Sequence, residues 1–383
     1  MSASPIAKRL LEATAGEHPV ISVVFDLNAA EFASARARAS QATSLLDAAH
    51  NLETADQTLN HDARQAIRSD LERLKTYLGS DELPVSGAEG LAIFVSQGSG
   101  LFETVALSRS STSSIYLDRE PHIEPVVIEP AAQRWCAVLV SSRDVTVDIG
   151  AGATSVTRST GSDYVRGHSQ SDGNDERGRE QDIEGHLIAV SQRLAADHRA
   201  GRFDVLALGG PVDALTGLEG RLPDELRSAL AGRLDIDPSA ATEADVAAAV
   251  SSLLARTYAE GQEQKLAAFK DQLAAARGQN GPASAVAGIP AVLESLAEQR
   301  VATLLLTDDF HAAGARCSKC RMLLPSDISE CPVDGTATAP VADLREPMIA
   351  AAVRQDATVL VFPDPDETLL ARPDHRTGAL LRF

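Results

Sequence analysis

The sequence predicts a mixed α/β protein, part α/β and part α+β, with three successive domains. Short runs rich in Val, Ile and Leu alternate with longer segments whose apolar residues recur every three or four positions. A Gly/Asn/Pro-rich stretch near 278–282 is typical of a linker. A chain of 383 residues is long enough for two or three domains, each with its own core. We place the domains at 1–128, 129–278 and 279–383.

The first domain, 1–128, mixes helices and strands. Its long helices are separated by a polar stretch that indicates a loop, and its strand patterns are short apolar runs. The expected elements, in order, are a helix at 5–12, a strand at 20–25, helices at 29–50 and 61–77 joined by a loop at 51–60, and strands at 90–95, 101–107 and 114–117.

The second domain, 129–278, opens with three strand patterns and then has a polar tract at 159–179. Polar tracts of that length inside a compact domain are usually functional loops or disordered segments. Thr242 and Asp245 form a capping-box pattern ahead of a long helical segment. The expected elements are strands at 134–140, 144–149 and 154–157, a helix at 180–198, a strand at 203–208, a helix from 222, a short strand at 232–236 and a helix at 242–275.

The third domain, 279–383, alternates helices with buried-type strands, which predicts a layered α/β arrangement. A Cys-containing insert interrupts it at 312–340. The expected elements are a helix at 285–298, a strand at 301–306, a helix at 347–354, a strand at 357–362 and a closing apolar segment at 378–383.

The insert has the outline of a zinc ribbon. Cys317 and Cys320 form one pair of ligands two residues apart, and Cys331 and Asp334 form a second. Zinc takes four ligands in a tetrahedron, and an aspartate is an acceptable fourth ligand where such ribbons usually have Cys. We expect one structural zinc here, with Asp327 or His311 as alternative fourth ligands; a relic ribbon that holds no metal is the other interpretation.

Composition limits the class of protein. A net charge of −19, from 35 basic and 54 acidic residues, argues against a broad nucleic-acid-binding surface but allows local basic patches. No apolar run is long enough to span a membrane, and the N-terminus lacks the apolar core of a signal peptide. With so few cysteines we expect a cytoplasmic protein, in which Cys136 is a buried small apolar residue.

The order of these features resembles the archaeal and eukaryotic class-1 peptide-chain release factors. The closer likeness is to a bacterial branch of that family, which includes the ribosome hibernation factor Balon and actinobacterial relatives. The residues that carry it are the strand at 301–306 leading into Asp308 and Asp309, the ribbon, the closing segment 378–383, and the Leu222–Leu226 and Leu234–Asp237 runs. The resemblance covers nearly the whole chain and is strongest after residue 130.

The resemblance implies an N-terminal domain that faces the decoding site and a ribonuclease-H-like middle domain. In the family, a Gly-Gly-Gln loop of the middle domain brings glutamine to the peptidyl-tRNA ester. Here the corresponding loop contains Gln170 without a preceding Gly-Gly pair, and the first domain lacks the Asn-Ile-Lys-Ser decoding motif. The loop residues that the resemblance implies as ribosome or tRNA contacts are Arg166, Gly167, His168, Ser169, Gln170, Gly173, Arg177 and Arg179.

Three functional hypotheses remain from the sequence. We favour an RNA-binding translation factor that occupies the ribosomal A site in hibernation or stalled-ribosome handling, with EF-Tu as the partner GTPase that the resemblance implies. The first alternative is a peptidyl-tRNA hydrolase or release factor in which Gln170 orients water. The second is a metal-stabilised protein-interaction module, which the acidic charge favours. No membrane partner is expected.

Overall fold

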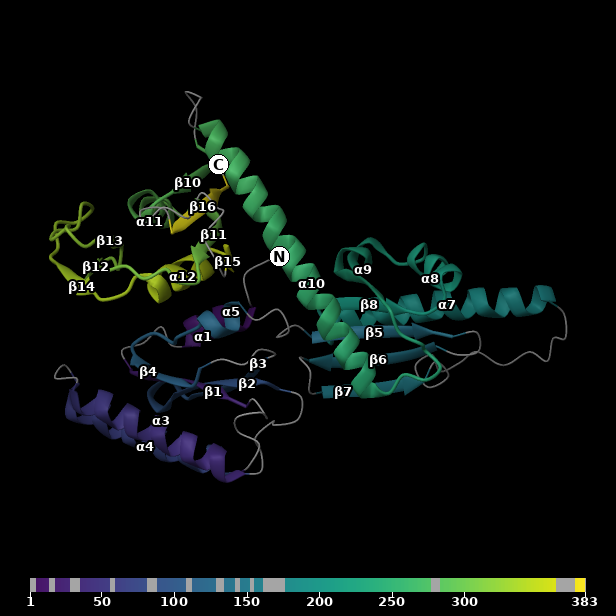
Figure 1. Cartoon of the computed structure of the whole chain (residues 1–383), viewed down its shortest axis with the longest axis horizontal. Coiled ribbons are helices and arrows are strands. Elements are labelled where there is room, and N and C mark those ends of the chain that lie inside the picture. The colour runs from purple at the N-terminus through teal and green to yellow at the C-terminus, as the bar shows by residue number, and fades with distance from the viewer. Residues whose placement is uncertain are drawn as a thin grey trace.

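The computed structural model describes residues 5–13, 18–27, 35–55, 59–80, 88–107, 112–128, 134–141, 145–151, 155–160, 176–276, 283–362 and 376–382. Within these residues, helices combine with two antiparallel and two mixed sheets, so the mixed α/β fold class is confirmed. The three larger sheets form the centres of what we call the N-terminal, middle and C-terminal units, whose elements are grouped around them in Figure 1.

The N-terminal unit is an antiparallel sheet with helices on both faces. Its strand order is β3 (Leu101–Leu107), β2 (Gly90–Ser96), β1 (Val20–Asp26) and β4 (Ser114–Asp118). Because alternate side chains of a strand point to opposite faces, Val23 packs beneath helices α3 (Ala35–Ala55) and α4 (His61–Leu78), whereas Val24 packs beneath α1 (Pro5–Ala13) and α5 (Glu124–Val127). Both faces of β1 are therefore buried along its whole length.

The expected loop at 51–60 is wrong over its first half. Helix α3 continues to Ala55 and α4 begins at His61, where the Asn60 side chain accepts the Ala63 N–H at 2.8 Å. The polar residues at 51–55 suggested a loop, but Glu53 is completely buried and binds the neighbouring helix. The tip of this helical hairpin is consequently shorter than the sequence predicts.

The middle unit has a five-stranded mixed sheet in the order β7 (Ser155–Thr160), β6 (Val145–Ala151), β5 (Arg134–Val140), β8 (Val205–Gly209), β9 (Leu230–Leu234). The first three strands in the chain form an antiparallel meander, and β8 and β9 then run parallel to β5. Helices α7 (Glu176–Arg199), α8 (Val212–Glu219) and α9 (Asp224–Ala229) cover one face. This is the topology expected of a ribonuclease-H-like unit.

The polar tract at 159–179 was too wide a prediction for a loop. Strand β7 runs to Thr160 and α7 begins at Glu176, so the backbones of Arg177 and Arg179 are helical. Residues 161–175, with the glutamine loop inside them, lie outside the described residues.

The C-terminal unit has a sheet ordered β10 (Ala285–Ala287), β16 (Thr377–Leu381), β11 (Val301–Thr307), β15 (Thr358–Phe362), with α11 (Ile289–Ala297) and α12 (Arg345–Arg354). The expected helix at 285–298 is wrong at its start, because 285–287 pairs antiparallel with β16 and the helix begins only at Ile289. Strand pairing outweighed the helical preference of the two alanines.

Helix α10 (Glu243–Ala276) contributes to two hydrophobic clusters. Its first half buries Val246 and Val250 against the middle sheet, and its second half buries Phe269 and Leu273 against the C-terminal sheet. The predicted capping box is confirmed at its start, since Thr242 and Asp245 each accept the other's backbone N–H, at 3.2 and 2.9 Å. Figure 1 shows this helix running from one unit to the other.

The N-terminal and C-terminal units share one apolar cluster. Leu10 and Leu11 of α1, with Phe94 of β2, belong to the same buried group as Met348 and Ile349 of α12. In Figure 1, α1 and α5 lie on the side of the N-terminal sheet that faces α12. These two units are thus packed as one body despite being far apart in sequence.

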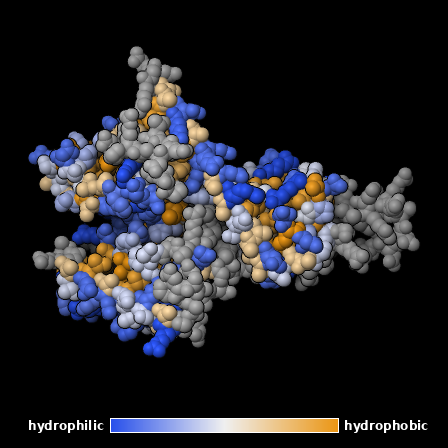
Figure 2. Space-filling view, viewed as in Figure 1, coloured by the Kyte–Doolittle hydropathy of each residue, from blue (hydrophilic) through white to orange (hydrophobic). Residues whose placement is uncertain are grey.

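Among the residues with described burial, the large apolar side chains that are exposed are Leu52, Tyr116, Ile188, Val212 and Val333. Figure 2 likewise shows hydrophobic and hydrophilic residues interspersed on the face in view. Among the helices of the described ranges, none combines the length and the hydropathy needed to cross a bilayer.

Candidate functional site

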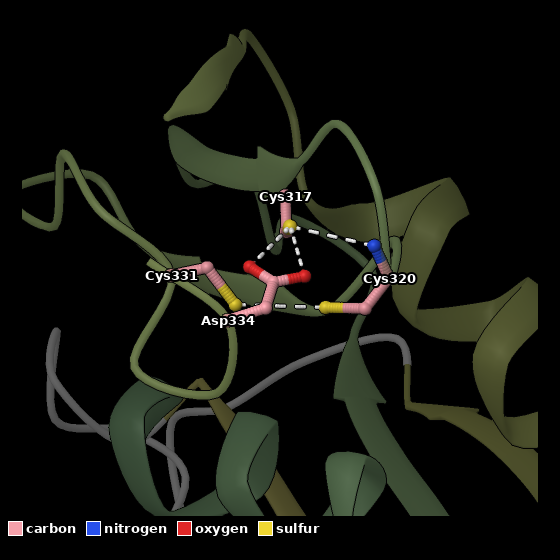
Figure 3. A group of neighbouring side chains, drawn as sticks. All are labelled: Cys317, Cys320, Cys331 and Asp334. Atoms are coloured by element: carbon pink, nitrogen blue, oxygen red, sulfur yellow. Dashed lines mark hydrogen bonds between the residues drawn. The ribbon is translucent and has the colours of Figure 1, made fainter. Parts of the chain in front are cut away.

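The ribbon insert places the four predicted ligand residues together. A three-stranded antiparallel sheet, β13 (Leu323–Pro325), β12 (Gly314–Cys317) and β14 (Thr338–Val341), holds two tight turns. In the first, the backbone N–H groups of Lys319 and Cys320 both point at Cys317 Sγ, at 3.4 Å each. In the second, Gly335 donates its N–H to the Cys331 carbonyl at 2.9 Å. Figure 3 shows the four side chains turned toward one another.

The ligand atoms have the spacing of a tetrahedral site. Cys320 Sγ and Cys331 Sγ are 3.5 Å apart, and Cys317 Sγ lies 3.7 and 3.9 Å from the two Asp334 oxygens. A tetrahedral zinc with Zn–S bonds of about 2.3 Å separates its sulfur ligands by roughly 3.8 Å. All four ligand atoms lie within 4.8 Å of one another, so a zinc-sized ion fits between them.

The chemistry of the donors favours a metal that takes thiolate and carboxylate. Burial raises the pKa of the Cys317 thiol, but the N–H groups of Cys320 and Lys319 outweigh burial and bring its pKa below the ordinary value. Burial raises the pKa of Cys331 to about 11. Metal binding must therefore displace a proton from Cys331, which makes affinity pH-dependent. The Thr336 N–H, 3.0 Å from Asp334 Oδ1, lowers the pKa of Asp334 and keeps this ligand ionised.

The alternative fourth ligands do not join this group. The His311 ring instead lies 2.6 Å from Asp343 Oδ2, beside the start of α12. Asp327 is absent from the ligand cluster found among the described residues. Of the three candidates, Asp334 is the residue that the fold brings to the cysteines.

The two turns have the same backbone hydrogen bond, from the N–H of the fifth residue to the carbonyl of the first, and the fifth residue is Arg321 in one and Gly335 in the other. Gly335, directly after Asp334, has φ +65° in the left-handed region; Arg321, directly after Cys320, has φ +62°. Glycine adopts that conformation freely, but a residue with a Cβ is strained there by roughly 1–2 kcal/mol. Sequence reasoning missed Arg321, although its place opposite Gly335 in the repeated spacing was a usable signal.

A second candidate site is the helical hairpin of α3 and α4. Glu53 is fully buried and its carboxylate accepts from Arg68 Nε at 3.2 Å, with His50 Nδ1 at 3.3 Å. Arg64 donates to the Glu53 carbonyl at 2.7 Å. Glu53 thus contacts three side chains of the hairpin, His50 and Arg68 through its carboxylate and Arg64 through its backbone carbonyl, a set that the sequence pattern did not reveal.

The two helices of the hairpin carry a small basic excess although the chain is acidic. They contain six Arg and Lys residues against five acids, and two of those acids, Glu53 and Asp70, are buried. A groove of about 520 Å³ runs between the helices, and its charged lining residues are Arg68, Lys75, Asp47 and Glu72. The basic residues of the hairpin are Arg36, Arg38, Arg64, Arg68, Arg73 and Lys75.

The remaining predicted residues have simpler outcomes. Residues 166–173 lie outside the described residues, and nothing is described of the side chains of Arg177 and Arg179. Cys136 is fully buried in β5, as predicted, and burial raises the pKa of its thiol well above the ordinary value. Gly210 directly follows β8; its φ is +143° and a Cβ there would lie 2.3 Å from the Val140 carbonyl oxygen, so its role is backbone packing.

No protein-family model matches the sequence, and no curated protein matches it. Solved structures do: the archaeal translation termination factor aRF1 is similar over 100% of this chain and 98% of its own, at 16% identity and a TM-score of 0.24. A chain from a model of ribosome-bound archaeal Pelota and ABCE1 is similar over 74% and 72%, at 14% identity and a TM-score of 0.41. Dom34 of S. cerevisiae, a translation termination-like factor, is similar over 77% and 79%, at 11% identity and a TM-score of 0.40.

Proposed function

We propose that this chain is a translation factor of release-factor type that acts by binding the ribosomal A site, in hibernation or in the handling of stalled ribosomes. The observation that carries the proposal is the position of the ribbon in the chain. It is inserted between β11 and α12 of the C-terminal unit, which follows the mixed-sheet middle unit in sequence. This is the order that the sequence resemblance to the release factors calls for.

The α3–α4 hairpin supplies the surface for ribosomal RNA. Arginine pairs with phosphate through a planar, bidentate donor set, and a few such contacts position a protein on RNA without reading sequence. The buried Glu53 restrains Arg64 and Arg68, which lowers the conformational entropy they would lose on binding. A local basic surface of this kind reconciles RNA binding with the overall charge of −19.

The glutamine loop favours binding without ester hydrolysis. A pair of glycines allows the backbone to adopt conformations that are closed to other residues. Gln170 has no such pair before it. The second candidate function is a peptidyl-tRNA hydrolase, which the presence of Gln170 itself favours. A peptidyl-tRNA release assay with Gln170→Ala separates the two: unchanged background release supports the binding factor, and a loss of measurable release supports the hydrolase.

We also propose that the metal is one structural zinc held by Cys317, Cys320, Cys331 and Asp334. With four protein ligands the ion has no open position for substrate, so its contribution is to hold the two turns of the ribbon together. Elemental analysis of the purified chain should find about one zinc per chain, and the Cys320→Ser variant should contain less.

Sedimentation through sucrose gradients tests ribosome binding. Tagged protein from growing and starved cells should appear in the ribosome peak and leave it at high salt, since phosphate contacts release counterions. Fractions that contain the protein should also contain EF-Tu if that GTPase is its partner. Protein confined to the top of the gradient in both states would contradict the proposal and favour the metal-stabilised interaction module.

A further inference from the structure

The metal-binding turn of the ribbon also contacts the N-terminal unit. Glu120, which follows β4, has a side chain only 12% exposed. Its carboxylate forms ion pairs with Arg316 at 3.7 Å, with Arg354 of α12 at 2.8 Å, and with Arg321. Arg316 and Arg321 are the residues immediately before Cys317 and immediately after Cys320. The two ribbon arginines that form ion pairs with Glu120 therefore lie on either side of the first ligand pair in the sequence.

The backbone at Arg321 indicates that this contact is more than incidental. Arg321 occupies the left-handed position at which the matching turn has Gly335. A strained residue persists where the surrounding structure requires it, and such positions cluster at functional contacts. Glycine would relieve the strain but would remove the guanidinium that binds Glu120. The arginine thus serves the contact between units rather than the turn itself.

The spacing of the two arginines depends on the turn. The Arg321 N–H donates to the Cys317 carbonyl at 3.1 Å, and the Cys317 N–H donates to the Met322 carbonyl at 2.9 Å. A metal bound by Cys317 and Cys320 closes the same turn from its other side. Metal binding and the ion pairs of Arg316 and Arg321 with Glu120 therefore require the same backbone conformation of this turn.

We propose that these residues form a metal-dependent clasp: an occupied metal site holds Arg316 and Arg321 in position to bind Glu120, and loss of the metal releases the N-terminal unit from the ribbon. The proposal rests on the metal site proposed above but not on ribosome binding. Because coupling between two sites is reciprocal, docking of Glu120 must in turn strengthen metal binding.

The first test measures zinc affinity of the full chain by competition with a chromophoric chelator. Glu120→Gln should weaken zinc binding by roughly fivefold or more, the lower end of typical coupling between sites. Glu330→Gln is the matched control: it neutralises an exposed carboxylate next to Cys331 without touching the clasp, and it should leave the affinity unchanged. Equal affinities in wild type and Glu120→Gln, or an equal loss in both variants, would overturn the proposal.

The second test follows hydrogen exchange of the segment 112–123, which contains Glu120. Chelation of zinc should speed exchange both there and in the ribbon, whereas Arg321→Gly should speed it in 112–123 while zinc content stays at the wild-type level. Lys319→Ala, which removes an exposed charge from the same turn, should do neither. Unchanged exchange of 112–123 after chelation and in Arg321→Gly, or a wild-type chain that binds no zinc, would refute the clasp.

Discussion

The N-terminal and middle units are joined to the C-terminal unit in different ways. The N-terminal unit shares an apolar cluster with it and adds ion pairs from Glu120, Glu124 and Lys8. The middle unit is joined through helix α10, whose Phe269 packs on the C-terminal sheet. A broad contact with many parts resists the loss of any one of them, whereas a contact made by one helix depends on a few side chains. The N- and C-terminal units should therefore move together, and α10 should set the place of the middle unit.

The largest effect is expected at the α10 contact. Phe269 is fully buried, and its ring lies so close to Gly378 that a Cβ there would come within 2.5 Å of Cζ. Phe269→Ala should lower the free energy of unfolding of the C-terminal unit by about 3–5 kcal/mol, the usual cost of such a cavity. Urea unfolding measures it, with Lys265→Ala as an exposed control on the same helix expected within about 0.5 kcal/mol of wild type. Equal effects of the two substitutions would show that α10 is not docked there.

A pair of substitutions in α12 sharpens the comparison at the N-terminal contact. Arg345 is buried, donates from Nε to Glu124 at 2.8 Å and also donates to the Thr307 carbonyl at 2.8 Å. Arg345→Ala leaves Glu124 without its partner and should cost about 3 kcal/mol. Arg354→Ala removes a half-exposed partner of Glu120 and should cost less than about 1 kcal/mol. The same urea titration checks both, and a reversed order would contradict the assignment of Arg345 as the central contact.

A smaller effect is expected from stiffening α10 between its two docked halves. Gly261 lies in the helix interior, where glycine is less favourable than alanine by about 0.8–1.0 kcal/mol. Gly261→Ala should raise the free energy of unfolding by up to that amount and slow hydrogen exchange in the middle of α10. Faster exchange or lower stability would show that the helix needs a flexible point at this position.

The smallest effect concerns pH. Burial raises the pKa of Asp343, but hydrogen bonds from His311 and from the Arg345 and Ala312 N–H groups outweigh it and lower that pKa below 3.8. The ionised carboxylate therefore stabilises the start of α12 above about pH 3.8, and this contribution is lost as the pH falls through the lower folded pKa. Asp343→Asn should flatten the acid limb of the stability profile in urea unfolding. An unchanged profile would place the acid sensitivity elsewhere.

Much of the fold could be predicted from local pattern. Strand β11 is a continuous apolar run, and the capping-box residues Thr242 and Asp245 indicate where α10 begins. The ribbon ligands followed from spacing alone, because two tight turns with paired ligands have a short-range signature. These features share one property: the residues that decide them are close together in the sequence.

The features that escaped prediction depend on distant partners. Strand β10 exists because residue 286 meets residue 379, and α3 extends past 51 because Glu53 is buried against α4. The pairing of Glu120 with Arg316, Arg321 and Arg354 joins segments about two hundred residues apart. The periodicity of a single sequence does not predict contacts between residues so far apart in the chain.

The central claim is that this chain binds the ribosomal A site, and one measurement tests it most directly. Purified, zinc-loaded chain is mixed with ribosomes whose A site is either vacant or filled by tRNA, and the bound fraction is measured after pelleting over a range of salt concentrations. The account predicts binding to the vacant ribosomes, weakened by salt and abolished by A-site tRNA. Equal binding to both kinds of ribosome, or none to either, would contradict it.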